Sequence, residues 1–160
     1  MRILGVDPGL QATGYGVIEF NGSTAKLLEA GTIKPKKTDL IQNKVHAIHK
    51  NLEEIILEYR PEVMVLEKIY THHQYLTTAG ILGHARGVIC LLCAQHGIKL
   101  VEQSVTRLRK AVLGKGRGSK FQMQGMVAHA LKIDGNKLTL DASDALALAL
   151  GYTQISTRQL

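Results

Sequence analysis

The sequence predicts an α/β fold in which a five-stranded mixed sheet carries helices on both faces. Two observations lead to this prediction. Short apolar runs bounded by turn residues alternate with longer segments whose apolar residues recur at helical spacing. The first three strand-like segments follow one another directly, whereas the last two are separated by helical segments. Short connections favour antiparallel pairing and helical crossovers favour parallel pairing, so one sheet is expected to contain both.

The first half of the chain is expected to form a three-stranded meander followed by a helix. The strands are expected at residues 2–6, 13–20 and 25–33. Asn21-Gly22 is a strong hairpin signal between the second and third strands. A helix is expected over 39–59, where one face collects Leu40, Val45, Ile48, Leu52, Ile55 and Ile56. Pro61 ends this helix.

The second half of the chain is expected to alternate helix and strand and then to end in helices. Strands are expected at 62–67 and 98–102, and helices at 76–95, 105–113, 120–131 and 141–152. At 160 residues and 45% hydrophobic, the chain has enough apolar residues for one core. We therefore expect a single domain over 1–152, followed by a frayed C-terminal tail at 153–160.

The charge distribution indicates an acidic polymer as the partner. The net charge is +7 and the sequence pI is about 9.5. No Asp or Glu occurs from Gln103 to Ile133, and this stretch carries Arg107, Arg109, Lys110, Lys115, Arg117, Lys120 and Lys132. Contacts with a DNA backbone are expected from the glycine-rich loop at 114–118 and from Arg107, Arg109, Lys110, Lys115 and Arg117. The alternative is a solvated basic surface. A P-loop is excluded because its spacing is absent.

The sequence does not indicate a secreted protein, a membrane protein or a zinc-binding protein. Met1-Arg2-Ile3 runs straight into a strand without a signal-peptide pattern. The longest apolar stretch is interrupted by His84, Arg86 and His96, so no membrane contact is expected. Cys90 and Cys93 lack a second pair of zinc ligands and are expected to be buried thiols. A cytoplasmic protein is expected.

Four acidic residues stand where a solvated charge is not expected. Asp7 closes the apolar run 3–6 and Glu67 closes the run 63–66. Asp141 and Asp144 are one helical turn apart at the start of an apolar helix. If the two strand ends and the helix start converge, the carboxylates share one pocket, and they stay ionised only around a cation.

These carboxylates are therefore candidate catalytic residues and metal ligands. Their oxygens suit Mg²⁺, with Mn²⁺ as a substitute, and two ions about 4 Å apart would support phosphodiester hydrolysis. Lys120 is the candidate cation at the reacting phosphate, and Tyr70 is placed to stack on a splayed base. Each residue also has a simpler explanation: Asp141 as a helix N-cap, Asp144 as a partner of the helix dipole, Asp7 as a turn residue, Glu67 at a solvated strand end and Tyr70 in the core.

The motifs in their order resemble those of the RuvC family of bacterial Holliday junction resolvases over essentially the whole chain. They lie at 2–9, 13–16, 65–67, 85–87, 112–116, 120 and 141–147. The resemblance implies a ribonuclease H-like fold and a homodimer that nicks two strands of a four-way junction symmetrically. It also implies metal ligation by Asp7, Glu67, Asp141 and Asp144, assistance by Lys120 and stacking by Tyr70 at the junction centre. The helix containing 85–87 would lie at the dimer interface, and the partners would be the RuvA and RuvB branch-migration proteins.

The chain departs from the family pattern at several positions that concern junction contacts. Arg109 stands where a second active-site lysine is usual, and Tyr70 replaces the commoner phenylalanine. The loop at 71–75 lacks a usual asparagine and is about one residue longer, and His84 replaces a glutamine.

Three other functions remain open at the level of sequence. Asp7-Pro8-Gly9 resembles the phosphate loop of actin-like sugar kinases and ATPases, although those proteins need two such domains. A non-catalytic junction-binding module and a ribonuclease H-like nuclease acting on RNA–DNA hybrids are the other two.

Overall fold

The computed structural model describes residues 1–68, 76–114 and 118–157. Its centre is a five-stranded sheet with the strand order β3-β2-β1-β4-β5. The strands are β1 (Arg2–Asp7), β2 (Thr13–Phe20), β3 (Ala25–Ile33), β4 (Val63–Glu67) and β5 (Lys99–Gln103). β1, β2 and β3 pair antiparallel, whereas β4 is parallel to both β1 and β5. The predicted mixed sheet is confirmed.

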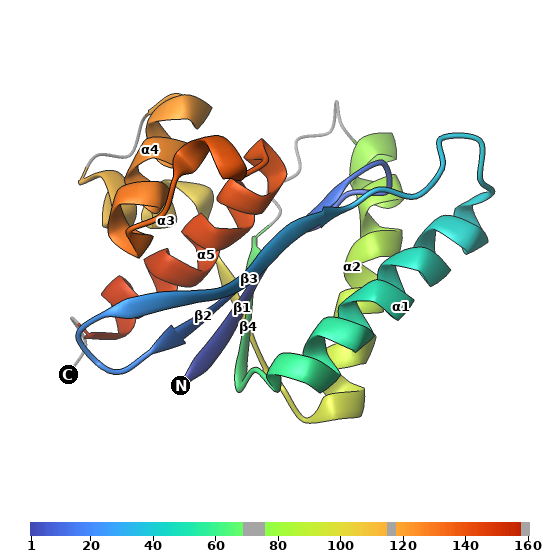
Figure 1. Ribbon diagram of the computed structural model, residues 1–160. Helices are drawn as coiled ribbons and strands as arrows, with labels where there is room; N and C mark the ends of the chain where they lie inside the picture. Colours follow the sequence, from blue (N-terminus) through green and yellow to red (C-terminus); the bar gives the residue numbers. More distant parts are fainter. Residues whose placement is uncertain (69–75, 115–117, 158–160) are drawn as a thin grey trace.

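The helices form one layer on each face of the sheet (Figure 1). One layer contains α1 (Ile41–Tyr59) and α2 (Leu76–His96), and the other contains α3 (Val105–Leu113), α4 (Lys120–Leu131) and α5 (Leu140–Thr157). Each layer has its own apolar core because strand side chains alternate between the two faces. Ile3 and Val65 face α5, whereas Leu4 and Met64 face α1 and α2.

The register of β1 and β4 brings their carboxyl ends together. Val6 pairs with Leu66 in the parallel ladder. Asp7 and Glu67 are the next residues on these two strands and the last residue of each. Two carboxylates distant in the chain therefore leave the sheet side by side.

α5 lies directly against the backbone of β1 and β2, which places its first turn at the same end of the sheet. A Cβ atom at Gly5 would overlap the carbonyl oxygen of Ala145, and one at Gly14 would overlap that of Asp141. Only glycine permits this close approach of helix and strand. The two glycines therefore set how near Asp141 and Asp144 come to the end of β1.

Two sequence predictions are wrong: where the last helix ends, and that both cysteines are buried. α5 continues to Thr157, so the expected tail at 153–160 is helical over its first five residues, and Thr153 is buried. Its hydroxyl donates to the carbonyl oxygen of Leu150 at 2.8 Å. Cys93 is buried as expected, but Cys90 is exposed.

Among the described helices, α2 is long and apolar enough to cross a membrane by length and composition, with a mean hydropathy of 1.5. This differs from the expectation that polar residues would interrupt the stretch. One face of α2, with Ala85, Ile89 and Leu92, is buried against the sheet and α1, as in the core helix of a globular protein. The opposite face of α2 exposes apolar residues.

Candidate active site

A pocket of about 270 Å³ opens at the carboxyl ends of β1 and β4. Its polar lining consists of Asp7 from β1, Glu67 from β4, Asp144 from α5 and Lys120 from α4. Its apolar walls are Leu108, Met123, Ala147 and Leu148. Three of the four predicted acidic residues and the predicted lysine thus share one pocket, although they come from four different elements.

The turn after Asp7 is held by a threonine. The hydroxyl of Thr13 donates to the carbonyl oxygen of Gly9 at 2.8 Å and accepts from the Gly9 N–H at 3.3 Å. Thr13 is completely buried at the start of β2. These bonds fix the connection from β1 to β2 and, with it, the backbone that carries Asp7.

Thr139, and not Asp141, caps the N-terminus of α5. The Thr139 hydroxyl accepts from the Ala142 N–H at 3.2 Å, and its carbonyl oxygen accepts from Ser143 at 2.9 Å. The same hydroxyl lies 2.6 Å from that of Thr32 on β3. The explanation of Asp141 as an N-cap is therefore wrong. Asp141 is half-buried in the first turn, beside the pocket but not in its lining.

The carboxylate of Asp7 is harder to ionise than an ordinary aspartate. Burial, followed by the negative charges of Asp144 and Glu67, raises the pKa of Asp7 from 3.8 to about 6. Lys120 opposes this increase, and Asp141 adds to it weakly. Asp7 is thus a carboxylate whose ionisation is costly unless further positive charge is brought to the pocket.

Lys120 is the cation that faces these carboxylates. Its Nζ lies 3.1 Å from Oδ2 of Asp144, and this hydrogen bond is the main reason that the pKa of Lys120 is raised. The first turn of α4 is fixed by a capping box in which Ser119 Oγ accepts from the Gln122 N–H and Gln122 Oε1 accepts from the Ser119 N–H. Lys120 is therefore protonated at neutral pH and presented from a well-defined helix start.

The chemistry of this donor set fits a hard divalent cation. Carboxylate oxygens are the ligands that Mg²⁺ and Mn²⁺ prefer. Burial first, and then the negative charges of Asp144 and Glu67, raise the pKa of Asp7, so a cation in the pocket would favour its ionised form. Within residues 1–68, 76–114 and 118–157, no three acidic, histidine or cysteine side chains already stand close enough to share one ion. The ammonium group of Lys120 is the neutralising charge beside Asp144.

Arg86 fixes the end of β4 and was not among the predicted site residues. This arginine of α2 is 12% exposed, and its Nη1 donates to the carbonyl oxygen of Glu67 at 2.6 Å. Its Nη2 donates to Oε1 of Glu102 on β5. A guanidinium thus holds the peptide group of the residue whose carboxylate lines the pocket. The sequence signal was an arginine inside an otherwise apolar helix.

The other predicted DNA-binding residues are only partly described. Arg107 and Lys110 are exposed on α3, which packs beside α4 and α5. Arg109 also lies on α3, but its side chain is outside the description. Tyr70, Lys115 and Arg117 lie outside the described residues, so the predictions for them stay predictions.

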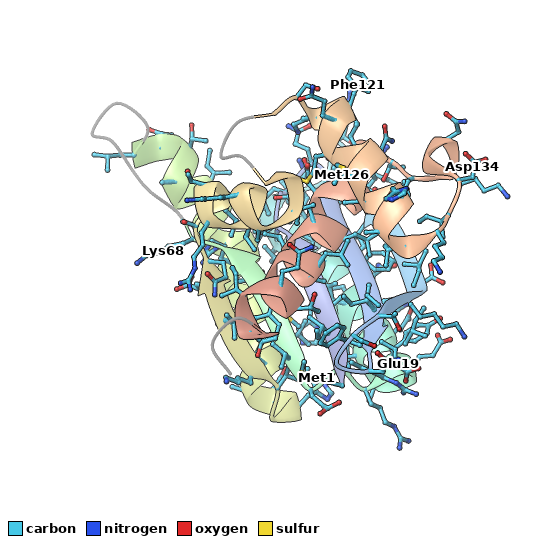
Figure 2. The ribbon with its side chains drawn as sticks, turned by 90° about the vertical axis from the view of Figure 1, so that its left-hand side faces the viewer. Met1, Glu19, Lys68, Phe121, Met126 and Asp134 are labelled. Carbon is cyan, nitrogen blue, oxygen red and sulfur yellow. The ribbon has the colours of Figure 1, made fainter. Side chains whose placement is uncertain are left out.

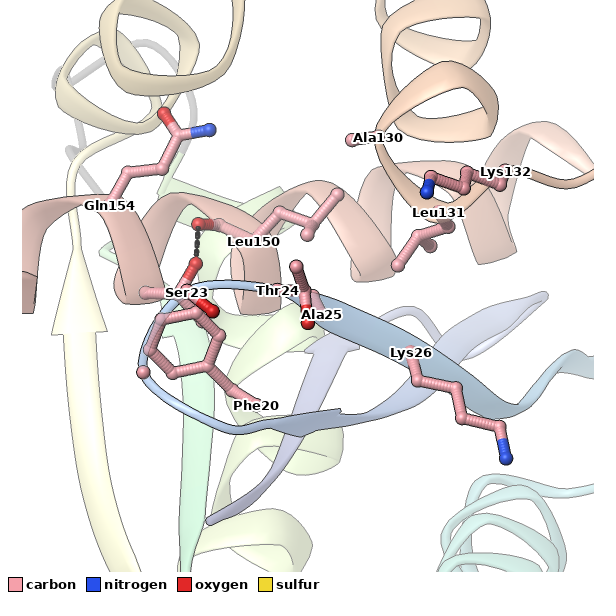
Figure 3. A pocket seen from close by; sticks show the side chains of 12 residues that line it. Phe20, Ser23, Thr24, Ala25, Lys26, Ala130, Leu131, Lys132, Leu150 and Gln154 are labelled. Carbon is pink, nitrogen blue, oxygen red and sulfur yellow. Dashed lines mark hydrogen bonds between the residues drawn. The ribbon is translucent and has the colours of Figure 1, made fainter.

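A larger cavity of about 590 Å³ lies toward the other end of α5 (Figure 3). Phe20, Leu150 and Thr24 lie along it, and Lys26 and Lys132 stand at its edges. Its lining contains no carboxylate, histidine or cysteine. The smaller pocket is the candidate active site because it combines several carboxylates with a lysine.

Comparisons with known proteins agree with this fold and indicate its family. The family model described as "Crossover junction endodeoxyribonuclease RuvC" matches residues 3–152. A protein of that name from Rhodopirellula baltica is 38% identical over 148 residues, covering 92% of this chain and 83% of its own. The structure of Thermus thermophilus RuvC matches with a TM-score of 0.87 and 25% identity, covering 99% of this chain and 97% of that one. The T. thermophilus protein in complex with a Holliday junction substrate shares the fold at a TM-score of 0.87 and 24% identity, with 98% and 95% coverage.

The family model spans the described sheet except its first residue and the described helices α1 to α4, and it reaches residue 152 of α5. The identity to the R. baltica relative extends over most of both chains. The chain belongs to the RuvC family of crossover junction endodeoxyribonucleases.

Proposed function

We propose that this chain is a Holliday junction resolvase, a metal-dependent endodeoxyribonuclease that nicks two strands of a four-way DNA junction symmetrically by water attack on the phosphodiester. Its role would lie in homologous recombination and repair. The observation that carries the proposal is the pocket in which Asp7, Glu67 and Asp144 face Lys120 in a chain of this family. The R. baltica relative is named for the same activity.

The carboxylates would hold the metal, and Lys120 would contact the phosphate. We propose Mg²⁺, with Mn²⁺ as a substitute, and two ions held by Asp7, Glu67, Asp144 and the adjacent Asp141. When bound, such ions activate the attacking water and stabilise the leaving 3′ oxygen. The protonated Lys120 supplies a fixed positive charge to the phosphate, from a helix start that carries no acidic residue.

The stretch from Gln103 to Ile133 would provide the DNA-binding surface. It contains no acidic residue, and its described helices α3 and α4 line the pocket through Leu108, Lys120 and Met123. Arg107 and Lys110 are exposed there. We include Arg109, Lys115, Arg117 and Tyr70 in this surface from their sequence positions alone.

The exposed face of α2 supports a homodimer. Ile81 and Leu91 are 49% and 51% exposed, and an added Cβ at Gly80, Gly83 or Gly87 would meet no atom within 4 Å. An apolar face with small residues allows two helices to approach closely, and a two-fold dimer matches a substrate cut at two symmetric positions. RuvA and RuvB are the proposed protein partners, and the cytoplasm is the proposed location.

Replacing Leu91 with Glu is expected to convert the dimer to a monomer at micromolar concentration, because a carboxylate in an apolar contact is left unpaired. Sedimentation velocity measures this directly. Leu57→Glu is the matched control, since Leu57 is 59% exposed on α1. Equal sedimentation of wild type and Leu91→Glu, both dimeric, would show that dimerisation uses another face.

One comparison of substrates tests the proposed activity. The purified chain with Mg²⁺ is expected to introduce paired nicks into a synthetic four-way junction and to leave an RNA–DNA hybrid duplex of the same sequence intact. Cleavage of the hybrid alone would indicate a different ribonuclease H-like nuclease. Junction binding without nicking in either Mg²⁺ or Mn²⁺ would indicate a binding module, and ATP hydrolysis would indicate the kinase-like alternative.

Arg86 is expected to act as a positioning residue for Glu67. Arg86→Met removes the bond to the Glu67 carbonyl and is expected to weaken metal binding about 10- to 100-fold, the usual effect of losing an outer partner of a metal ligand. Mn²⁺ titration calorimetry without DNA measures this affinity. Glu102→Gln is the control, because it weakens the ion pair with Arg86 but leaves the bond to Glu67. An unchanged Mn²⁺ affinity in a folded Arg86→Met variant would exclude the role.

A further inference from the structure

Phe121 is the most exposed large apolar side chain in the described part of the chain. It is 73% exposed at the start of α4, and Figure 2 shows it at the outer end of that helix. An aromatic ring left in water forgoes the stabilisation that burial would provide. The buried residues of α4 are Met123, Val127, Ala128 and Leu131, so this ring is not part of the core.

The position of Phe121 is tied to the candidate active site. It follows Lys120, whose Nζ is 3.1 Å from Asp144, and it precedes Gln122, which closes the capping box with Ser119. Successive residues of a helix point roughly 100° apart. Lys120 lines the pocket, and Phe121 is the next residue on the same capped helical turn, where its ring is exposed to solvent.

The charge around Phe121 in the chain favours a nucleic acid as the molecule that contacts this ring. The first turn of α4 has no acidic residue, and the whole stretch from Gln103 to Ile133 has none. A polyanion is attracted to such a surface. The layer of α4 lies on the opposite face of the sheet from α2, so the proposed dimer contact through α2 leaves Phe121 accessible.

We propose that Phe121 is a DNA-contacting residue that stacks on an unstacked base of the nucleotide next to the scissile phosphate. The proposal rests on the proposed function, since Lys120 defines where that phosphate lies. Aromatic rings that hold splayed bases accept any base, because every base has a π face. Phe121 thus strengthens binding and holds the strand in place beside Lys120.

Two variants and a control test this contact. Junction affinity is measured in Ca²⁺, a condition chosen to slow cleavage, and stacking is monitored by 2-aminopurine fluorescence at the nucleotides on each side of the cut. Phe121→Ala is expected to bind roughly 5- to 100-fold more weakly and to lose the fluorescence quenching. Phe121→Trp is expected to restore both. Leu57→Ala removes a similarly exposed side chain from α1 on the other layer and is expected to change neither.

The outcomes separate this inference from the proposed function. If wild type nicks the junction and Phe121→Ala binds it and quenches the fluorescence as wild type does, the proposed base contact of Phe121 is wrong. The proposed nuclease activity is then unaffected. Weaker association between protein molecules in Phe121→Ala, with normal quenching, would assign the residue to self-association and also overturn the proposal. Wild type that neither binds nor nicks the junction would overturn the proposed function itself.

Discussion

Asp7→Asn is expected to abolish nicking and to leave junction binding close to that of wild type. Asp7 shares the pocket with Glu67 of β4 and Asp144 of α5, and burial together with the charges of Asp144 and Glu67 raises its pKa to about 6. Under the proposed function Asp7 is a metal ligand, and an amide at this position has no negative charge to offer the ion. We expect the single-turnover rate to fall by more than about a hundredfold, since even outer partners of metal ligands are worth 10- to 100-fold. Gel mobility in Ca²⁺ measures binding separately from cleavage.

The same substitution is expected to stabilise the metal-free protein at neutral pH. The pKa of Asp7 is about 6 in the folded protein against an ordinary value of 3.8, so folding favours the protonated form. That contribution is fully present below pH 3.8 and is lost as the pH rises through about 6. Above this range the ionised Asp7 destabilises the fold by on the order of 2–3 kcal/mol, at about 1.4 kcal/mol per pKa unit.

Thermal unfolding in EDTA at two pH values tests this prediction. At pH 7.5 the Asp7→Asn variant is expected to melt roughly 5–10 °C above wild type, and at pH 4 the difference should largely disappear. Glu54→Gln is the matched control, because Glu54 is exposed on α1 and its neutralisation should shift neither curve. A variant that melts below wild type at pH 7.5 would mean that Asp7 stabilises the metal-free fold, contrary to its raised pKa.

The candidate site could largely be predicted from sequence because its acidic residues terminate elements that the sequence itself predicts. Asp7 and Glu67 each end a buried apolar run, and parallel pairing of those runs brings their ends together. Asp144 was found because it opens an apolar helix. The sequence could not show that Asp141 stays outside the pocket lining, since that depends on the rotation of α5 against Gly5 and Gly14.

Other features depend on contacts between segments far apart in the chain. Arg86 and Glu67 are 19 residues apart, and only the packing of α2 against the sheet joins them. The extension of α5 to Thr157 was missed because Gly151 suggested a helix end, yet an added Cβ there would overlap Leu108 of α3. The close contact of α3 with α5 explains the glycine, so Gly151 is a packing residue and not a stop signal.

Lys120→Met is expected to slow cleavage at saturating junction by more than tenfold. Because the hydrogen bond to Asp144 raises the pKa of Lys120, the side chain is a cation at neutral pH and is unsuited to act as a base. Under the proposed function it contributes a positive charge beside the phosphate as negative charge develops, and removal of one such contact typically costs about 100- to 1,000-fold. Single-turnover rates measure the effect.

A competing role for Lys120 makes the opposite prediction. If the ammonium group served only to neutralise Asp144 at 3.1 Å, its removal would leave the carboxylates more attractive to a cation. Lys120→Met would then bind Mn²⁺ more tightly and cleave at an undiminished rate. Lys120→Arg keeps the charge but not the compact ammonium, so under the catalytic role it should retain an intermediate rate. Lys50→Ala, which removes one exposed charge from α1 on the other helical layer, should cleave like wild type.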